Sequence, residues 1–118
     1  MKKITVVTAV LMTMMVWSCT KDSITTVDCT GTAPTYTSAV KALLDNKCAT
    51  SGCHGASNPE SGLDYSTYAI AKTNAAKDNF RGSIQHLSGY DAMPKGASKL
   101  SDADLKTLNC WVQNGMPQ

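Results

Sequence analysis

The chain has 118 residues, with 11 Lys and Arg side chains against 9 Asp and Glu, five Cys and a single Phe. This length suits one domain rather than two. The nearly balanced charge excludes the electrostatic footprint of a nucleic-acid-binding protein, so no nucleic acid is expected among its partners.

The first 18 residues have the pattern of an export signal. Two lysines precede an apolar stretch, residues 4–17, that is too short for a stable membrane span. Ser18 and Cys19 follow, as in a bacterial lipoprotein signal, so we expect residues 1–18 to be removed and Cys19 to become a lipidated N-terminus. A plain secretory signal that is cut nearby is the alternative. In both cases the protein leaves the reducing cytosol.

The expected mature chain, from Cys19 to Gln118, is poor in large apolar residues. Leu, Ile, Val and Phe make up 14 of its 100 residues, below the roughly 20% at which a chain struggles to bury a core. Its nine basic side chains balance nine acidic ones. A disordered chain normally combines a low content of large apolar residues with a high net charge. We therefore expect a cofactor or disulfides to supply the missing apolar surface or crosslinks.

Residues 19–37 are polar, rich in Thr and without a helical period. We interpret them as a tether that lifts a domain, residues 38–118, off the lipid surface. The first helix of that domain is predicted over about Ser38 to Lys47, behind a Thr37 or Ser38 cap. Its apolar residues recur on one face at i, i+3 and i+4: Val40, Leu43 and Leu44.

Directly after this helix comes Cys48-Ala-Thr-Ser-Gly-Cys53-His54, two thiols followed by an imidazole. This is a widened form of the haem-attachment pattern C-x-x-C-H, in which both cysteines bond to one haem and the histidine ligates its iron. The pattern predicts Cys48 and Cys53 as tethers and His54 as the proximal ligand. The four-residue spacing requires a bulge, which Gly52 suits.

Four cysteines remain in the mature chain besides the lipidated one, and they leave several arrangements open. If Cys48 and Cys53 hold a haem, Cys29 and Cys110 remain, and an even remainder in an oxidising compartment favours a disulfide. The same count permits two disulfides, Cys29 to Cys110 and Cys48 to Cys53, and no haem. A metal module of Cys48, Cys53 and His54 is a third option, which lacks an obvious fourth ligand for tetrahedral zinc.

A short helix is predicted over about Asp78 to Leu87, and a loop with Met93 follows it. Pro94 favours an extended backbone at Met93. A thioether presented from an ordered loop suits the distal side of a low-spin haem, so we expect Met93 to be the sixth ligand. His86 is the rival ligand, and its other interpretation is an exposed helix residue.

The last helix is predicted from Ser101 to just before Gly115, with Asp104 as an acidic variant of a capping box. Cys110 falls about 140° from Leu105 at 100° per residue. It therefore points away from the buried stripe, where the N-terminal segment could cross and bond it. The stripe itself consists of Leu105, Leu108 and Val112.

The order of these features resembles the small class I-like cytochrome c domains of bacterial envelope lipoproteins. The resemblance covers about Cys29 to Pro117. It implies an all-α fold of about three to four helices around one covalent haem c, with His54 and Met93 as axial iron ligands. The matching motifs are Cys48-x4-Cys53-His54-Gly55, Gly62-Leu63-Asp64-Tyr65-Ser66-Thr67-Tyr68, Ala92-Met93-Pro94, Leu100-Ser101 and Trp111-Val112-x-x-Gly115.

The residues and the resemblance together predict an electron carrier and not an enzyme. No nucleophile motif occurs in the sequence, and a six-coordinate haem has no open site for oxygen or peroxide. We expect a monomer that is anchored to a membrane by lipid on Cys19, faces the periplasm or the cell surface, and meets other redox proteins weakly and briefly. The alternative is a haem-free, disulfide-stabilised structural or interaction lipoprotein.

Overall fold

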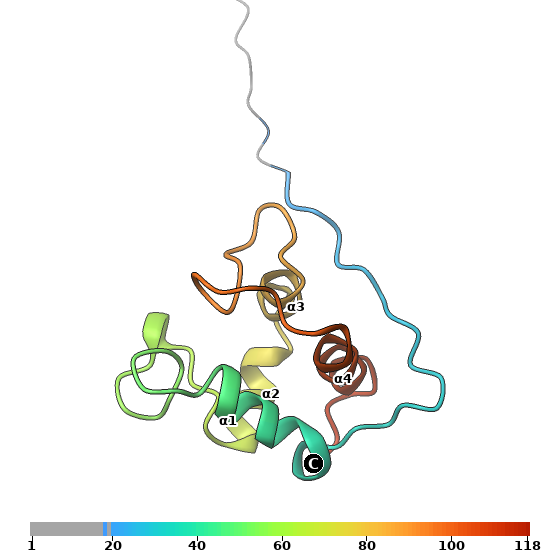
Figure 1. Cartoon of the computed structure of the whole chain (residues 1–118), viewed down its shortest axis with the longest axis horizontal. Coiled ribbons are helices and arrows are strands. Elements are labelled where there is room, and N and C mark those ends of the chain that lie inside the picture. Colours follow the sequence, from blue (N-terminus) through green and yellow to red (C-terminus); the bar gives the residue numbers. More distant parts are fainter. Residues whose placement is uncertain (1–17, 19) are drawn as a thin grey trace, which may run out of the picture.

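The computed structural model describes Ser18 and residues 20–118. The predicted signal segment, apart from Ser18, and the predicted lipidation site Cys19 therefore lie outside the described residues. The described chain contains four α-helices and no strand (Figure 1), so the all-α class is confirmed at this level. No helix in this part of the chain is long and apolar enough to cross a membrane.

The first helical segment begins slightly earlier than the sequence predicts. A π-helical turn, η1 (Tyr36–Val40), leads into α1 (Lys41–Lys47). The Thr35 hydroxyl accepts a hydrogen bond from the Ser38 amide at 3.2 Å, and the Ser38 hydroxyl accepts one from the Thr35 amide at 3.1 Å. Because Thr35 satisfies a free amide of the first turn, the helical run starts two residues before Ser38.

The longest helix, α4 (Asp102–Gln113), starts where the sequence predicts, since the Ser101 hydroxyl accepts a hydrogen bond from the Asp104 amide at 3.2 Å. Trp111 of this helix is fully buried, and its ring centroid lies 6.1 Å from that of Tyr36 in η1. The Trp111 indole donates to the Pro117 carbonyl at 2.9 Å. The first and last helical segments are thus joined through aromatic rings.

Two short helices, α2 (Tyr68–Ala75) and α3 (Asp78–Ile84), lie between these segments in the chain. No helix is predicted at α2 from the sequence, because its buried positions are mainly alanines, which give a weak apolar signal. α3 ends three residues before the predicted Leu87. The cause is His86, whose φ of 55° belongs to the left-handed region and cannot continue a right-handed helix.

The core is small and only partly aliphatic. Aromatic rings and alanines fill much of the space that Leu, Ile and Val would occupy in a richer chain. This composition agrees with the low content of large aliphatic residues noted above. The core consists of Tyr36, Val40, Leu44, Tyr65, Ala71, Ala75, Phe80, Ile84, Leu100, Leu108 and Trp111.

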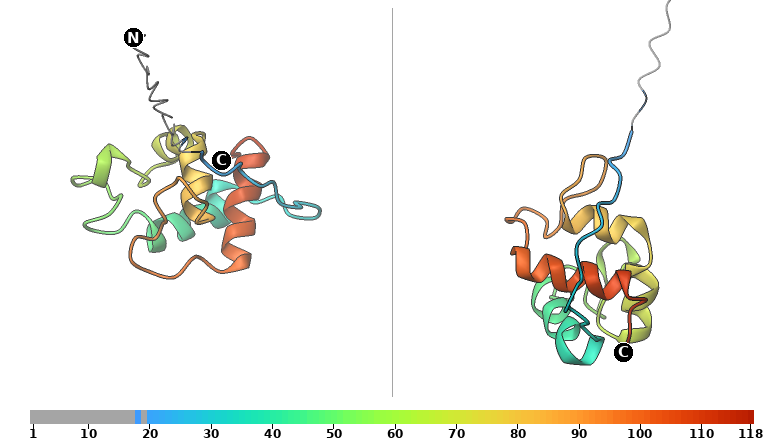
Figure 2. Two further views of the ribbon diagram at one scale, coloured as in Figure 1. Left: turned by 90° about the horizontal axis from the view of Figure 1, so that it is seen from above. Right: turned by 90° about the vertical axis from the view of Figure 1, so that its right-hand side faces the viewer.

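Residues 21–33, here called the N-terminal strap, lie against the domain (Figures 1 and 2). Arg81 of α3 donates to the Thr25 carbonyl at 2.8 Å. The Gln113 side chain of α4 exchanges two hydrogen bonds with the backbone of Val27, each 3.0 Å long. Most of the polar segment interpreted as a tether is therefore attached to α3 and α4, because these long polar side chains satisfy its backbone.

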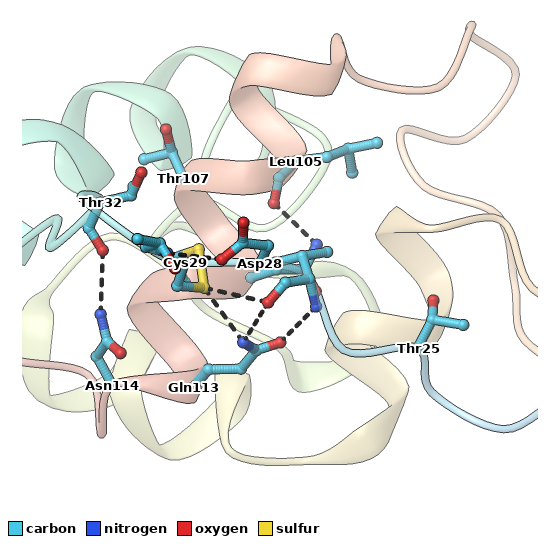
Figure 3. The surroundings of a disulfide bond; sticks show 12 residues. Thr25, Asp28, Cys29, Thr32, Leu105, Thr107, Gln113 and Asn114 are labelled. Atoms are coloured by element: carbon cyan, nitrogen blue, oxygen red, sulfur yellow. Dashed lines mark hydrogen bonds between the residues drawn. A yellow bond between two sulfur atoms is a disulfide. The ribbon is translucent and has the colours of Figure 1, made fainter.

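The strap is also bonded covalently to α4 by a disulfide between Cys29 and Cys110, whose Cα atoms are 5.5 Å apart (Figure 3). Cys110 lies outside the apolar stripe of α4 and is nevertheless fully buried, because the strap covers it. The Gln113 amide donates to the Cys29 sulfur at 3.2 Å. This pairing is common to the haem-bearing and the two-disulfide arrangements, and the structure confirms it.

Candidate cofactor site

Two cavities of about 280 and 500 Å³ share part of their walls between the loop after α1 and the loop after α3. Of the residues predicted to hold a haem, Cys48, His54 and Met93 line both cavities, and Cys53 lines the smaller one. The fold therefore gathers all four around one space, although Met93 lies far from the other three in the sequence. The shared lining residues are Cys48, His54, Glu60, Ile84, Met93 and Lys95.

The loop from Cys48 to His54 folds back on itself. Cys48 ends α1, where its amide donates to the Leu44 carbonyl at 2.8 Å. The Cys48 carbonyl then accepts a hydrogen bond from the His54 amide at 3.0 Å. Gly52 has a φ of 77°, which a residue with a Cβ rarely adopts. The widened spacing thus forms a closed turn that keeps Cys48 and His54 in backbone contact.

The two cysteines of this loop are free thiols that differ in exposure. Cys48 is half-buried and packs against the core, whereas Cys53 is exposed. Burial, and secondarily the nearby Cys53, raises the pKa of the Cys48 thiol to about 11. Cys48 is therefore protonated at neutral pH and lacks the thiolate that a nucleophilic cysteine needs.

The His54 imidazole is buried and held in one orientation. Its Nδ1 lies 2.9 Å from the Leu63 carbonyl oxygen. Because a carbonyl can only accept, Nδ1 is the donor in this bond, and Nε2 is the ring nitrogen left for another partner. The Tyr65 ring meets the imidazole edge-on, with the ring centroids 5.5 Å apart. A histidine whose Nδ1 donates to a backbone carbonyl is oriented to bind a metal through Nε2.

Met93 is fixed through both of its backbone polar groups. Its amide donates to the Ser83 carbonyl, and its carbonyl accepts from His86 Nε2, each at 3.0 Å. The Met93 side chain is half-buried. His86 lines neither of the two cavities described above. Of the two candidates for the sixth ligand, Met93 therefore lies at the cavity and His86 contacts its backbone.

The loop that carries Met93, residues 85–100 and here called the Met93 loop, is also anchored through Tyr90. The Tyr90 ring lies directly over Gly82 of α3, where an added Cβ would come within 2.4 Å of the ring. The Lys21 ammonium lies 4.7 Å from the ring centroid, and the Asp22 carboxylate accepts from the Ser88 amide at 2.8 Å. The start of the strap thus contacts the Met93 loop.

The cavities are lined by apolar, charged and uncharged polar residues. The larger cavity, of about 500 Å³, falls within the range of roughly 300–1,000 Å³ that holds small molecules and cofactors, and the smaller one, of about 280 Å³, lies just below it. Thiols, imidazole and thioether suit an iron porphyrin, and lysines suit its carboxylates. The apolar residues are Leu63, Phe80, Ile84 and Leu100, and the charged ones include Lys47, Glu60, Lys77 and Lys95.

Some contacts at the site carry no signal in the sequence. The Leu63 carbonyl that orients His54 is a backbone group, and the left-handed conformation of His86 is set by its surroundings. Among residues 20–118, no three His, Cys, Asp or Glu side chains form a group that could hold a metal ion. No protein-family model, curated protein or solved structure matches this chain.

Proposed function

We propose that the protein is a class I-like, mono-haem cytochrome c that carries single electrons at the bacterial cell envelope. The observation that carries the proposal is the pair of adjoining cavities around which Cys48, Cys53, His54 and Met93 gather. Thiols are the groups that bond haem c covalently, and imidazole with thioether is an axial pair found in electron-carrying cytochromes.

The bound haem would supply the one-electron redox couple. Cys48 and Cys53 would hold its porphyrin by thioether bonds. His54 would ligate the iron through Nε2, since its Nδ1 is bonded to the Leu63 carbonyl. The Met93 sulfur would bind from the other loop. A thioether in this position favours ferrous iron and raises the reduction potential above that of a site with two histidines.

The composition of the chain supports the same proposal. A porphyrin enclosed by the cavity walls would bury several hundred square ångströms of apolar surface, worth about 25 cal/mol per Å². This gain is on the order of that from several large side chains, which the core of this protein lacks. A cofactor would therefore help to stabilise a domain with few aliphatic residues.

The carrier would act as a monomer that is anchored to a membrane through lipid on Cys19. It would face the periplasm or the cell surface and exchange electrons with other redox proteins. Cys53 is exposed, so a porphyrin bonded to it would be accessible to a partner at that end. Such contacts are typically small and short-lived.

The test is expression of the full chain in a bacterial host that has haem c maturation proteins. We expect a reduced c-type absorption band that survives acid-acetone extraction, and a mass that includes one haem. Cys48→Ala combined with Cys53→Ala should remove the covalently bound haem. The matched control, Cys29→Ala combined with Cys110→Ala, also removes two cysteines and should keep it. Colourless, folded protein without the haem mass would favour the haem-free lipoprotein instead.

The axial ligands are tested separately. Met93→Ala should abolish the near-infrared absorption of ferric iron bonded to sulfur, because the variant has no thioether to offer. Met116→Ala, in the other Met-Pro pair of the chain, should retain this absorption and serves as the control. If His86→Ala abolishes it and Met93→Ala does not, the assignment of Met93 is wrong.

A further inference from the structure

His86 lies close to the candidate site, and the proposed function gives it no role. Its side chain is half-buried, it lines neither of the two cavities, and its φ of 55° is unfavourable for a residue with a Cβ. Such a conformation persists only where the surrounding contacts hold it. The left-handed turn ends α3 and directs the chain into the Met93 loop.

The contact that the His86 ring makes is a hydrogen bond to the Met93 backbone. Its Nε2 lies 3.0 Å from the Met93 carbonyl oxygen, and because a carbonyl can only accept, the ring is the donor. The Met93 amide donates to the Ser83 carbonyl, also at 3.0 Å. The backbone of Met93 is thus bonded to Ser83 in the last turn of α3 and to His86, two residues beyond the end of that helix. Ile84, the last residue of α3, lines both cavities.

Beyond Tyr90, the Met93 loop has few such anchors. Within residues 20–118, no other side chain donates a hydrogen bond to residues 91–100. The exposed stretch after Pro94 has a local backbone bond, from the Ala97 amide to the Pro94 carbonyl at 3.3 Å. The position of the Met93 side chain therefore depends strongly on the two bonds that its backbone makes with Ser83 and His86.

We propose that His86 is a positioning residue: its bond to the Met93 carbonyl holds the Met93 loop closed and so determines how firmly the Met93 sulfur stays on the haem iron. This role rests on the proposed function. A thioether is a weak, neutral ligand, so its occupancy of the sixth position depends on the loop that presents it. A bond that favours the closed loop therefore favours ligation.

The experiment measures the binding of free imidazole to the ferric, haem-loaded protein at a fixed neutral pH. Imidazole can bind the iron only when the Met93 sulfur leaves, so its apparent affinity is proportional to the fraction of molecules with an open loop. The loss of one neutral hydrogen bond shifts such an equilibrium by about fivefold. We expect His86→Ala to bind imidazole about fivefold more tightly than the wild-type protein.

Two further substitutions separate the hydrogen bond from the backbone strain. In His86→Gln, the side-chain amide nitrogen is as many bonds from Cβ as Nε2 is in histidine, so it can donate the same hydrogen bond. The imidazole affinity of this variant should therefore return toward the wild-type value. His86→Gly adopts a φ of 55° without strain but donates nothing, so it should behave like His86→Ala. The near-infrared absorption should persist in all three variants, because each retains the Met93 sulfur.

The matched control is Tyr68→Phe. The Tyr68 hydroxyl donates to the Met116 carbonyl at 2.9 Å, so this variant also loses a side-chain bond to a methionine carbonyl. Tyr68 lines neither of the two cavities. Tyr68→Phe should lower the denaturant midpoint about as much as His86→Ala while its imidazole affinity stays at the wild-type value.

Each outcome decides between the two proposals. Equal imidazole affinities in haem-loaded wild-type protein and His86→Ala overturn the role of His86 and leave the proposed function intact. If the imidazole affinity rises as much in His86→Gln as in His86→Ala, the role of His86 is overturned as well. This comparison can still be made if His86→Gly fails to fold. Wild-type protein with no haem spectrum overturns the proposed function and, with it, this role.

Discussion

The two sides of this domain are stabilised by different kinds of contact. On one side the N-terminal strap is fixed to α3 and α4 by a disulfide and by hydrogen bonds from Arg81 and Gln113. On the other side the loop of residues 48–62 projects away from strap residues 25–33 (Figures 1 and 2). Its contacts are mainly backbone hydrogen bonds, and the cavities lie next to it.

This difference indicates where the domain lacks apolar contacts. The strap side joins its two sulfur atoms in a disulfide and buries its largest ring, Trp111, in the core. The cavity side leaves Cys48 and Met93 half-buried and Cys53 exposed. If a cofactor completes the fold, it does so on the cavity side, and substitutions on the two sides should have different consequences.

The largest effect is expected from removal of the disulfide. Cys29→Ala combined with Cys110→Ala frees a loop closed across a sequence separation of 81 residues, and the free energy of unfolding should fall by about 4 kcal/mol. Denaturant unfolding followed by circular dichroism measures this loss. In haem-free protein, Cys48→Ala combined with Cys53→Ala breaks no crosslink and should cost much less. Equal losses would contradict the contrast between the two sides.

The next effect concerns Cys48 and pH in haem-free protein. Folding raises the pKa of this thiol from 9.0 to about 11. The contribution of the protonated thiol to the free energy of unfolding is therefore complete below about pH 9 and is lost as pH rises toward 11. The loss of unfolding free energy should approach roughly 2 to 3 kcal/mol.

The measurement compares the free energy of unfolding of wild-type protein and Cys48→Ala between pH 8 and pH 11. The variant has no thiol to ionise, so its stability should decline less over this interval. Haem-loaded protein should also lack the dependence, because a thioether sulfur has no proton to lose. Parallel pH profiles for haem-free wild-type protein and the variant would show that Cys48 is not desolvated.

A smaller effect is expected where the Met93 loop packs on α3. Gly82→Ala places a Cβ within 2.4 Å of the Tyr90 ring, and this overpacking should cost about 1 to 2 kcal/mol. In a Tyr90→Ala background the clash is absent, and the same substitution should become neutral or stabilising because Ala favours helix over Gly. A cost that is unchanged in this background would show that Tyr90 does not pack on Gly82.

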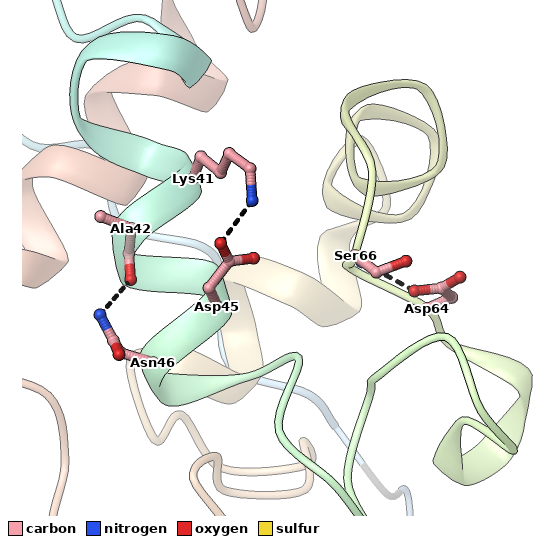
Figure 4. A network of polar contacts seen from close by, with 6 residues as sticks. All are labelled: Lys41, Ala42, Asp45, Asn46, Asp64 and Ser66. Atoms are coloured by element: carbon pink, nitrogen blue, oxygen red, sulfur yellow. Dashed lines mark hydrogen bonds and ion pairs between the residues drawn. The ribbon is translucent and has the colours of Figure 1, made fainter.

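The smallest effect is expected on the outer surface of α1. Lys41 and Asp45 form an exposed ion pair one turn apart (Figure 4), and such pairs contribute little because solvent and salt screen them. Lys41→Gln should leave the denaturant midpoint unchanged within error at 0.15 M salt. A clear loss that disappears at high salt would show that this pair matters more than the exposed geometry suggests.

The sequence predicted those parts of the fold that depend on local patterns. Ser101 starts the last helix as predicted, and Cys48 follows directly from α1. α2 was missed because alanines give little periodic signal. The count of thiols favoured a disulfide between Cys29 and Cys110 without fixing the pairing, and it could not show that the strap would cover Cys110. The site residues were predicted from motif and order, and their gathering around one cavity required the fold.

The sequence by itself determined the start of the last helix and singled out the candidate residues Cys48, Cys53, His54 and Met93, because capping and motif spacing are local properties. Thiol parity favoured a disulfide between Cys29 and Cys110 but left other arrangements open, and the structure shows this bond. Only the tertiary structure decided that the N-terminal strap is attached to α3 and α4, that the His54 ring is bonded to the Leu63 carbonyl, and that His86 donates a hydrogen bond to the Met93 carbonyl. These contacts join groups distant in the chain, often through backbone atoms, so no side-chain pattern encodes them.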